Sequence, residues 1–365
     1  MFASRRIPQP GSQKARRRAF SVAAVLLAVS LLAACGRGST PQSGGEPTRS
    51  DAPVGEARKV RVVATFLPYA ELARIVGGDR AEVHMLVPDG LDPHDWEPRP
   101  SDAMRIEQAD LVIYNGAGLE PWLLRMLDRA PADRPARIEA VAGLQLLPAP
   151  KPALAAPQHE HDHDHDHGHD ERHTEGHGDE GHAHDHDTGG VDPHIWLDPV
   201  LLQDVVKRLR DALSQLDPEG AQGYAQRAEA LIADLARVDS SYRDTLSTCQ
   251  QRQVLVTHGF YAYPAARYGL EQLPVMGVSP EAEPSPQTLA RLADLARDRG
   301  IRTLFAETLV GRRVAETLAR EAGLTVRVLN PMEGLTPEQR AQGVTLFDLF
   351  EQNLQELKAG LGCGA

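Results

Sequence analysis

Two short stretches, one hundred residues apart, carry nearly the same residues in the same order. Residues 92–97 read Asp-Pro-His-Asp-Trp-Glu, and residues 192–198 read Asp-Pro-His-Ile-Trp-Leu-Asp. Proline fixes the backbone directly before His94 and His194, so both imidazoles leave rigid loops. A tryptophan two residues after each histidine can cover one side of its ring. A third isolated histidine, His258, follows a short apolar run.

We expect these three histidines, His94, His194 and His258, to converge on one metal ion. They are far apart in the sequence, so the site would form only on folding, unlike the close ligand pairs of zinc fingers. A single histidine of this kind is more often a hydrogen-bonded loop residue. Two observations favour a metal site instead. His94 and His194 lie in matching Asp-Pro-His-x-Trp sequences, and the three histidines are three of only four that lie outside the histidine-rich segment described below. His84 itself falls inside a predicted strand and is interpreted as structural.

Nitrogen-rich sites prefer zinc and its later neighbours, whereas manganese prefers carboxylate oxygens. We therefore expect Zn²⁺, although copper and nickel stay open on intrinsic affinity alone. A fourth donor is needed unless water fills the position. Its candidates are Glu307, after the predicted strand 303–306, and Asn330 or Glu333, after the predicted strand 325–329.

The first 34 residues form a targeting segment. Basic residues at 14–18 precede an apolar run at 20–32 that is too short to span a bilayer comfortably. Small residues then lead into Cys35, which predicts lipidation of this cysteine after cleavage of 1–34. The alternative is a plain secretory signal with a chance cysteine. Residues 35–57 are rich in Gly, Pro, Ser and Thr and predict a flexible tether from the membrane to the folded part.

The bulk composition is ordinary for a globular protein. The chain has 365 residues, enough for two domains with cores, and is 41% hydrophobic and 25% charged. Its formal net charge is -12. The first 34 residues carry six basic and no acidic side chains, so the remainder has 33 basic against 51 acidic residues, a net charge of -18. An acidic body repels nucleic acid and attracts cations, so we expect no nucleic-acid role.

Strands and helices alternate along the chain, which is typical of the α/β class with mainly parallel sheets. We expect two lobes, 58–217 and 247–365, each with such a sheet flanked by helices, joined by one long rigid helix at 218–246. Expected strands are 59–64, 81–87, 111–114, 137–147, 253–257, 273–278, 303–306 and 325–329. Expected helices outside the joining one are 68–76, 100–108, 120–128, 199–216, 261–268, 285–299, 312–322 and 337–359. The glycine pair within 115–118 is read as a turn, because it lacks the third glycine and the lysine of a phosphate loop.

A low-complexity insertion at 158–188 interrupts the first lobe. It has almost no apolar side chain, so it cannot bury a core and is predicted to be disordered. It could capture zinc and pass it to the main site, sense excess metal, or be a solvated linker that binds metal incidentally. Its histidines are His159, His161, His163, His165, His167, His169, His173, His177, His182, His184 and His186.

Two cysteines remain beyond the targeting segment, Cys249 and Cys363. In an oxidising compartment two such cysteines favour one disulfide, which here would tie the C-terminal tail to the start of the second lobe. Two buried thiols are the alternative.

Six stretches together resemble the metal-binding lipoproteins of ABC importers for zinc and manganese, the cluster A-I solute-binding family. They are Gly-Leu-Asp-Pro-His-Asp-Trp-Glu-Pro at 90–98, Tyr-Asn-Gly-Ala-Gly-Leu-Glu-Pro-Trp at 114–122, Asp-Pro-His-Ile-Trp-Leu-Asp-Pro at 192–199, Thr-His-Gly-Phe-Tyr-Ala-Tyr at 257–263, Gly-Val-Ser-Pro-Glu-Ala-Glu-Pro at 277–284 and Phe-Ala-Glu-Thr at 305–308. The resemblance covers about residues 59–363. It implies two α/β lobes joined by a long helix, and a monomer anchored outside the cytoplasm that delivers Zn²⁺ to a permease and its ATPase.

The resemblance places His94, His194 and His258 on the family's ligand positions. It also implies zinc, because zinc members carry histidine at the third position and a histidine-rich insertion, whereas manganese members usually carry a carboxylate there. Many members add an aspartate from a Leu-Asp-Pro segment, but here residues 329–331 read Leu-Asn-Pro. We therefore favour Glu307, or water, as the fourth ligand, with Asn330 as the alternative.

Three other functions deserve a test. Uptake of manganese or another divalent metal would use the same fold. A zinc hydrolase would use three histidines and an open position for water, but the sequence has no His-Glu-x-x-His motif. A surface adhesin would bind matrix even after removal of the three histidines. We expect a binding protein and not an enzyme.

Overall fold

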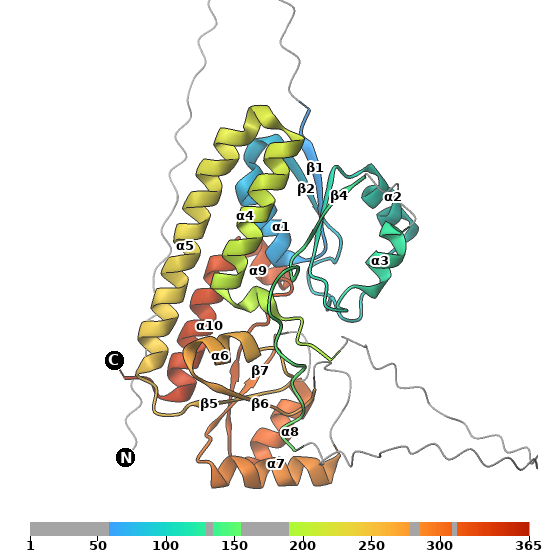
Figure 1. Ribbon diagram of the computed structural model, residues 1–365. Coiled ribbons are helices and arrows are strands. Elements are labelled where there is room, and N and C mark those ends of the chain that lie inside the picture. Colours follow the sequence, from blue (N-terminus) through green and yellow to red (C-terminus); the bar gives the residue numbers. More distant parts are fainter. Residues whose placement is uncertain (1–57, 129–133, 155–189, 278–284, 309–311, 365) are drawn as a thin grey trace, which may run out of the picture. The chain divides into compact units, whose positions relative to one another are not determined.

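The structure is a computed structural model that describes residues 58–128, 134–154, 190–277, 285–308 and 312–364 (Figure 1). The predicted targeting segment with Cys35, the tether and the histidine-rich insertion therefore lie outside the described residues. Within the described ranges, no helix combines the length and apolar character needed to cross a membrane.

The first half builds a four-stranded parallel sheet with the strand order β2-β1-β3-β4. Its strands are β1 (Val60–Ala64), β2 (Ala81–Met85), β3 (Leu111–Tyr114) and β4 (Ala136–Glu139). Crossover helices connect them: α1 (Leu67–Gly77), α2 (Pro100–Gln108) and α3 (Pro121–Leu127). Because the strands are parallel, their carboxyl ends share one edge, and the loop that leaves β2 carries His94.

The second half repeats this topology with the order β6-β5-β7-β8, again all parallel. The strands are β5 (Gln253–Val256), β6 (Glu271–Pro274), β7 (Thr303–Ala306) and β8 (Thr325–Val328). The helices between them are α6 (Ala262–Tyr268), α7 (Pro286–Asp298) and α8 (Arg312–Ala322). The predicted α/β class with two parallel sheets is confirmed.

Two long helices connect the sheets in the chain, α4 (Pro199–Leu216) and α5 (Ala221–Ser247), the second with 27 residues (Figure 1). They are joined through the short turn Pro218–Gly220, where proline starts the turn without losing a needed N–H. Near one end of α5, the Arg227 side chain donates to the carbonyl of Val76 in α1. Near the other end, the Tyr242 hydroxyl donates to Phe350 O. This helix therefore contacts helices that belong to both sheets.

The C-terminal segment differs from the single predicted helix 337–359. It forms two helices, α9 (Pro337–Gln342) and α10 (Leu346–Leu361). Gly343 ends α9 in the left-handed conformation, with φ 70°. Thr345 then starts α10 through a capping box with Asp348. The strand predicted at 137–147 is also shorter, because the extended ladder ends at Glu139.

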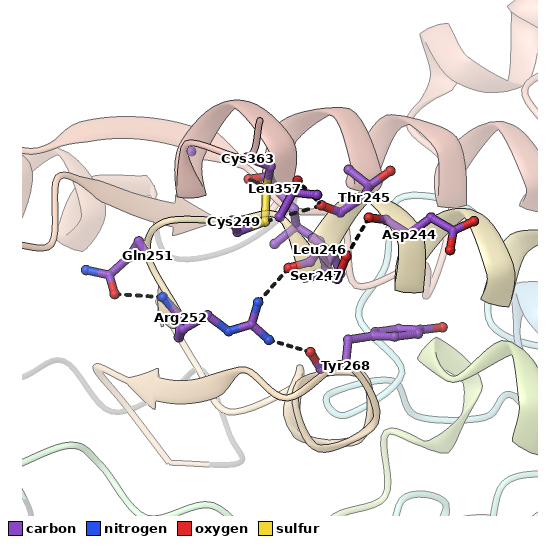
Figure 2. Close-up of a disulfide and its surroundings, with 12 residues drawn as sticks. Asp244, Thr245, Leu246, Ser247, Cys249, Gln251, Arg252, Tyr268, Leu357 and Cys363 are labelled. Carbon is purple, nitrogen blue, oxygen red and sulfur yellow. Dashed lines mark hydrogen bonds between the residues drawn. A yellow bond between two sulfur atoms is a disulfide. The ribbon is translucent and has the colours of Figure 1, made fainter. Parts of the chain in front are cut away.

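The tail that follows α10 is held next to the end of α5. Cys249 and Cys363 form a disulfide in the structure (Figure 2). The two residues also form an isolated antiparallel bridge, and Gln251 N donates to Leu361 O beside it. In the structure, backbone hydrogen bonds as well as the disulfide therefore hold the C-terminal tail against the segment that follows α5.

Candidate metal centre

His94 lies in the loop between β2 and α2. The Asp92 carboxylate accepts a hydrogen bond from the backbone N–H of His94 at 2.8 Å, which closes a tight turn around Pro93. The His94 side chain is buried, whereas Leu91 and Asp95 beside it are exposed. This loop therefore presents a buried imidazole from a partly exposed backbone.

His194 lies in the corresponding turn, just before α4. Asp192 Oδ1 accepts the backbone N–H of His194 at 2.9 Å, as in the first loop, and also contacts His194 Nδ1 at 2.7 Å. Trp196 packs beside the His194 ring, with 5.0 Å between centroids, and donates its indole N–H to Pro331 O at 2.7 Å. The predicted tryptophan cover is thus present here, whereas Trp96 packs edge-on against Trp122.

His258 follows β5 at the carboxyl edge of the second sheet. The neighbouring strand β7 ends at Ala306, and Glu307 follows it directly, so its side chain meets that of His258 at the same edge of the sheet. Glu307 Oε1 contacts His258 Nδ1 at 2.5 Å and accepts the Thr257 hydroxyl at 2.8 Å. The carboxylate therefore orients the ring from behind.

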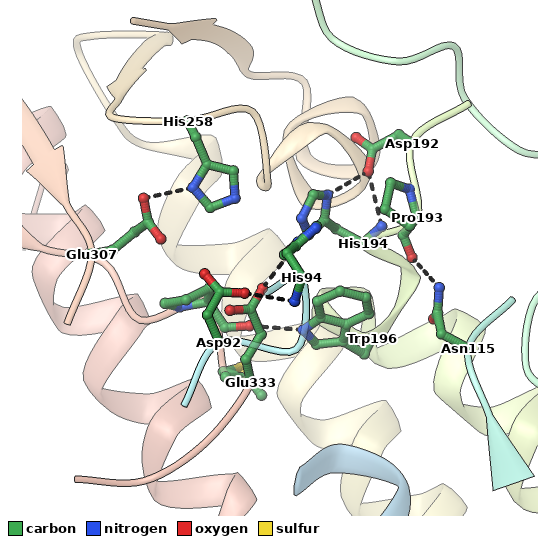
Figure 3. Close-up of polar contacts among 12 residues, drawn as sticks. Asp92, His94, Asn115, Asp192, Pro193, His194, Trp196, His258, Glu307 and Glu333 are labelled. Carbon is green, nitrogen blue, oxygen red and sulfur yellow. Dashed lines mark hydrogen bonds and ion pairs between the residues drawn. The ribbon is translucent and has the colours of Figure 1, made fainter. Parts of the chain in front are cut away.

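Four side chains offer ligand atoms within 4.8 Å of one another (Figure 3). They are His94, His194, His258 and Glu333, and all four are buried. The imidazole centroids are 5.4 to 6.2 Å apart. Zinc–nitrogen bonds of about 2.0–2.1 Å in a tetrahedron place donor atoms roughly 3.4 Å apart, so a bound ion would draw these groups together by about 1 Å.

The ring nitrogens of His194 and His258 have distinct partners. Each Nδ1 faces a carboxylate, from Asp192 and Glu307 respectively. Both Nε2 atoms are buried and have no hydrogen-bond partner among the described residues, and the same holds for Glu333 Oε1. A carboxylate that accepts Nδ1–H fixes the tautomer in which Nε2 carries the lone pair, which is the form that ligates metal.

Burial and charge set the protonation of the site. Burial lowers the pKa of His194, although Asp192 opposes this shift. Burial raises the pKa of the Glu333 carboxyl well above its usual range, and nearby negative charges, that of Asp92 first, add to it. Burial also raises the pKa of Asp92 to about 6. The site thus combines neutral imidazole with carboxyl groups that a divalent cation would help to ionise.

The carboxylate that the structure groups with the three histidines is not the one favoured from the sequence. Glu307 lies behind His258, on its Nδ1 side, and is not among the four grouped side chains. Asn330 is also engaged elsewhere, because its side-chain oxygen accepts Met332 N–H at 2.7 Å. Glu333, the remaining sequence candidate, completes the group, with Oε1 3.8 Å from His94 Nε2. His84 lies on β2, apart from this group, as expected.

Sequence reasoning did not assign the residues behind the ligands. The roles of Asp192 and Glu307 as ring partners depend on which nitrogen faces them, and no sequence signal gives that. The aspartate shared by the two Asp-Pro-His turns was a signal that could have drawn attention to Asp192, but not to its contact with the ring. The eleven histidines of the insertion lie outside the described residues.

The chain is similar to proteins of known function along most of its length. The family model described as zinc-uptake complex component A, periplasmic, matches residues 62–360. The high-affinity zinc uptake system protein ZnuA of Bacillus subtilis is 33% identical over 342 residues, which cover 94% of this chain and 96% of that protein.

Two further similarities concern one streptococcal protein. The zinc-binding lipoprotein AdcA of Streptococcus pneumoniae is 34% identical over 300 residues, which cover 82% of this chain. The chain spans 55% of the length of AdcA. The solved structure of the Zn(II)-bound ZnuA-like domain of AdcA has a TM-score of 0.66 and 30% identity, and it covers 83% of this chain and 99% of that domain.

Proposed function

The chain belongs to the family of the periplasmic component A of zinc-uptake complexes, and we propose that it captures Zn²⁺ outside the cytoplasm and delivers it to an ABC permease. Proteins of this family are solute-binding transport components that work with a permease and its ATPase; they are not enzymes. The proposed ligands are His94, His194, His258 and Glu333. The observation that carries the proposal is the convergence of four buried donor atoms within 4.8 Å.

The donor set supports zinc as the cargo. Three imidazoles and one carboxylate match the ligands and the coordination number of zinc, whereas manganese prefers more oxygen donors. Four protein donors also leave no open position for a nucleophilic water. This favours a binding site over the hydrolase alternative, which needs three protein donors and an open position.

Metal analysis and chelator competition on the purified chain test the ligand set. Glu333→Gln and His258→Ala should each weaken the tightest zinc site strongly. Glu307→Gln should weaken it less, because Glu307 acts through the His258 ring and keeps an acceptor oxygen. A stronger loss in Glu307→Gln than in Glu333→Gln would instead make Glu307 the ligand.

Membrane attachment is the second part of the proposal. The apolar run at 20–32 and the small residues before Cys35 support cleavage after residue 34 and lipidation of Cys35, with 35–57 as the tether. The protein then acts as a monomer on the outer side of the cell membrane. Cys35→Ser should release it from the membrane fraction, and a variant that remains membrane-bound would remove this part of the proposal.

The disulfide and the insertion complete the proposal. In an extracytoplasmic compartment Cys249 and Cys363 form a stable structural disulfide, detectable as a mass gain on reduction and alkylation. The histidine-rich insertion at 158–188 captures scarce zinc and passes it to the four-ligand site. Deletion of 159–186 should slow growth at limiting zinc, and unchanged growth and affinity would leave the insertion as a linker.

A further inference from the structure

The turn that follows β3 has an unfavourable backbone conformation, which must be stabilised by surrounding contacts. Gly116, Ala117 and Gly118 all have positive φ, at 85°, 52° and 77°. Alanine rarely adopts this region, and such residues persist only where the surroundings over-determine them. The turn belongs to the stretch 114–122, to which the proposed zinc site assigns no role.

The Glu120 carboxylate holds this turn together. It is buried, and its Oε1 accepts the Thr65 hydroxyl and the Asn115 N–H, each at 2.9 Å. Its Oε2 accepts the Gly116 N–H at 3.0 Å. Three donors from two segments therefore fix the backbone at Asn115, the first residue of the turn.

The Asn115 side chain points from this fixed backbone toward the Pro193 carbonyl, in the turn that carries His194 (Figure 3). It is fully buried, and its Oδ1 accepts the hydroxyl of Tyr69. Carbonyl oxygens only accept, so the two that face the other end of the amide identify it as Nδ2, and the Tyr69 hydroxyl then donates to Oδ1 and holds the amide in this orientation. Nδ2 donates to the carbonyl of Pro193 at 3.0 Å, and also to Gly116 O at 3.1 Å.

The bond to Pro193 acts on the peptide that carries His194. The carbonyl of this peptide is held by Asn115, and its N–H is held by Asp192 Oδ1 at 2.9 Å. The plane of the peptide is thereby fixed from both sides. Since the ring is also held at Nδ1, His194 Nε2 keeps one position and one direction.

We propose that Asn115 is a positioning residue for zinc, which fixes the His194 imidazole through the Pro193 carbonyl, with Tyr69 orienting the amide. This inference rests on the proposed zinc function, because it assumes that His194 binds the ion. Outer partners of metal ligands typically contribute 10–100-fold to affinity, and Asn115 acts one peptide further away. We therefore expect about a tenfold contribution.

Two variants and one matched control test the proposal in the full mature chain. Asn115→Leu keeps the volume and removes the donor, and Tyr69→Phe removes only the group that orients the amide. Tyr242→Phe is the control, because its hydroxyl makes a buried bond to Phe350 O between α5 and α10, and Tyr242 is neither one of the four grouped residues nor a hydrogen-bond partner of the His194 turn. All three should lose some thermal stability, because each loses a buried hydrogen bond.

The zinc readouts separate positioning from stability. Chelator competition should show zinc binding about tenfold weaker in Asn115→Leu, a smaller loss in Tyr69→Phe, and no change in Tyr242→Phe. With one equivalent of Co²⁺, the visible absorption bands should shift in the first two variants and match the wild type in the third, because these bands report ligand geometry.

Each outcome decides one question. Wild-type affinity and cobalt bands in Tyr69→Phe and Asn115→Leu would overturn the positioning role. An equal affinity loss in all three variants would do the same, because stability alone would explain it. If Asn115→Leu does not fold, the comparison of Tyr69→Phe with Tyr242→Phe decides. A wild-type chain that binds no zinc would refute the proposed function, and with it the premise of the inference.

Discussion

The two Asp-Pro-His-x-Trp loops have the same local geometry but different surroundings. In both, the aspartate accepts the backbone N–H of the histidine two residues later, at 2.8 Å in the His94 loop and 2.9 Å in the His194 loop. The residues from Asp192 to Pro199 are all buried, whereas Leu91 and Asp95 on either side of the first turn are exposed. Local sequence therefore sets the turn, and distant residues set how firmly it is held.

The partners of the two loops make this difference concrete. Three side chains donate to the His194 loop. Asn115 donates to Pro193 O, and Tyr263 donates its hydroxyl to Asp192 O. Arg267 pairs with the Asp198 carboxylate. These donors come from both halves of the chain, and the acceptors lie within seven residues. The His94 loop meets the second half through the buried approach of His94 to Glu333 and through an ion pair of Asp89 with Arg340 at a partly exposed position. We infer that His194 is the fixed ligand and His94 the adaptable one.

The largest expected effects come from removing either histidine. His94→Ala and His194→Ala each delete one of four donors, so zinc affinity should fall by more than the roughly 100-fold maximum typical of an outer partner. His194→Ala should also lower the free energy of unfolding of the metal-free chain by about 1–3 kcal/mol, and by more than His94→Ala, because it leaves the fully buried Asp192 without its ring partner. Chelator competition and urea unfolding measure the two quantities. Equal stability losses in the two variants would contradict the difference between the loops.

The paired aspartates give the next effect. Asp92→Asn and Asp192→Asn both keep an oxygen that can accept the backbone N–H, so both turns should survive. Asp192 also contacts the His194 ring, at 2.7 Å, and loss of its charge should weaken zinc binding about tenfold. Asp92→Asn should cost less, as measured by the same competition assay. The reverse order would mean that the charge near the ion matters more than ring orientation.

Much of this arrangement could be predicted from the sequence. Short apolar runs gave the strand Leu111–Tyr114, and helical periodicity with a leading proline gave α4 at Pro199–Leu216. The three histidines were singled out by the repeated Asp-Pro-His turns and by the apolar run before His258, and the structure brings all three into one group. Periodicity did not reveal the break at Gly343, because the six residues of α9 (Pro337–Gln342) are mostly polar and too few to show a period, and the glycine alone marks the end of this helix.

The fourth donor could not be chosen from the sequence for a physical reason. Glu307 and Glu333 both follow strands of the second sheet, so spacing does not separate them. The choice depends on the side of the His258 ring on which each carboxylate lies. Glu307 lies at Nδ1 because β7, which precedes it, pairs with β5, which precedes His258. The packing of Trp96 likewise could not be predicted, because this loop residue packs against Trp122, which comes from α3.

A smaller effect should appear in the pH dependence of stability, beside the adaptable ligand. The pKa of Glu333 is raised in the folded, metal-free chain, chiefly by burial, so the folded state holds this proton more tightly than the unfolded state. Its contribution to stability is therefore complete below about pH 4.5 and is lost as pH rises toward the raised pKa. Glu333→Gln removes this loss.

Thermal melting of the metal-free proteins measures this contribution. The melting temperature of Glu333→Gln minus that of the wild type should increase from pH 5 to pH 8. The variant should also lose most of the stabilisation that zinc gives to the wild type. A difference that stays constant with pH would show that Glu333 is already ionised without metal.

The smallest effect concerns the ion pair that holds the His94 loop. Arg340 Nε and Nη2 bind the two Asp89 oxygens at 2.6 and 2.9 Å, and Leu335 N–H also donates to this carboxylate. Asp89 lies five residues before His94, and Leu335 lies two residues after Glu333. These bonds to the Asp89 carboxylate therefore link the two chain segments that carry the proposed ligands His94 and Glu333. Surface pairs contribute about 0.2–1 kcal/mol, so Arg340→Gln should speed zinc release by no more than about fivefold.

Stopped-flow release into excess chelator measures this rate, with Arg327→Gln as the matched control. Arg327 pairs with Glu356 at 2.9 Å in the same half of the chain, and its loss should leave the rate unchanged. Salt screens a partly exposed pair, so high ionic strength should accelerate release from the wild type and have little effect on Arg340→Gln. The doubly swapped chain, with Asp89→Arg and Arg340→Asp, should recover part of the slow rate. If release from Arg340→Gln equals that from the wild type at low salt, the His94 loop is held by its buried contacts alone, and the two loops are more alike than their surfaces indicate.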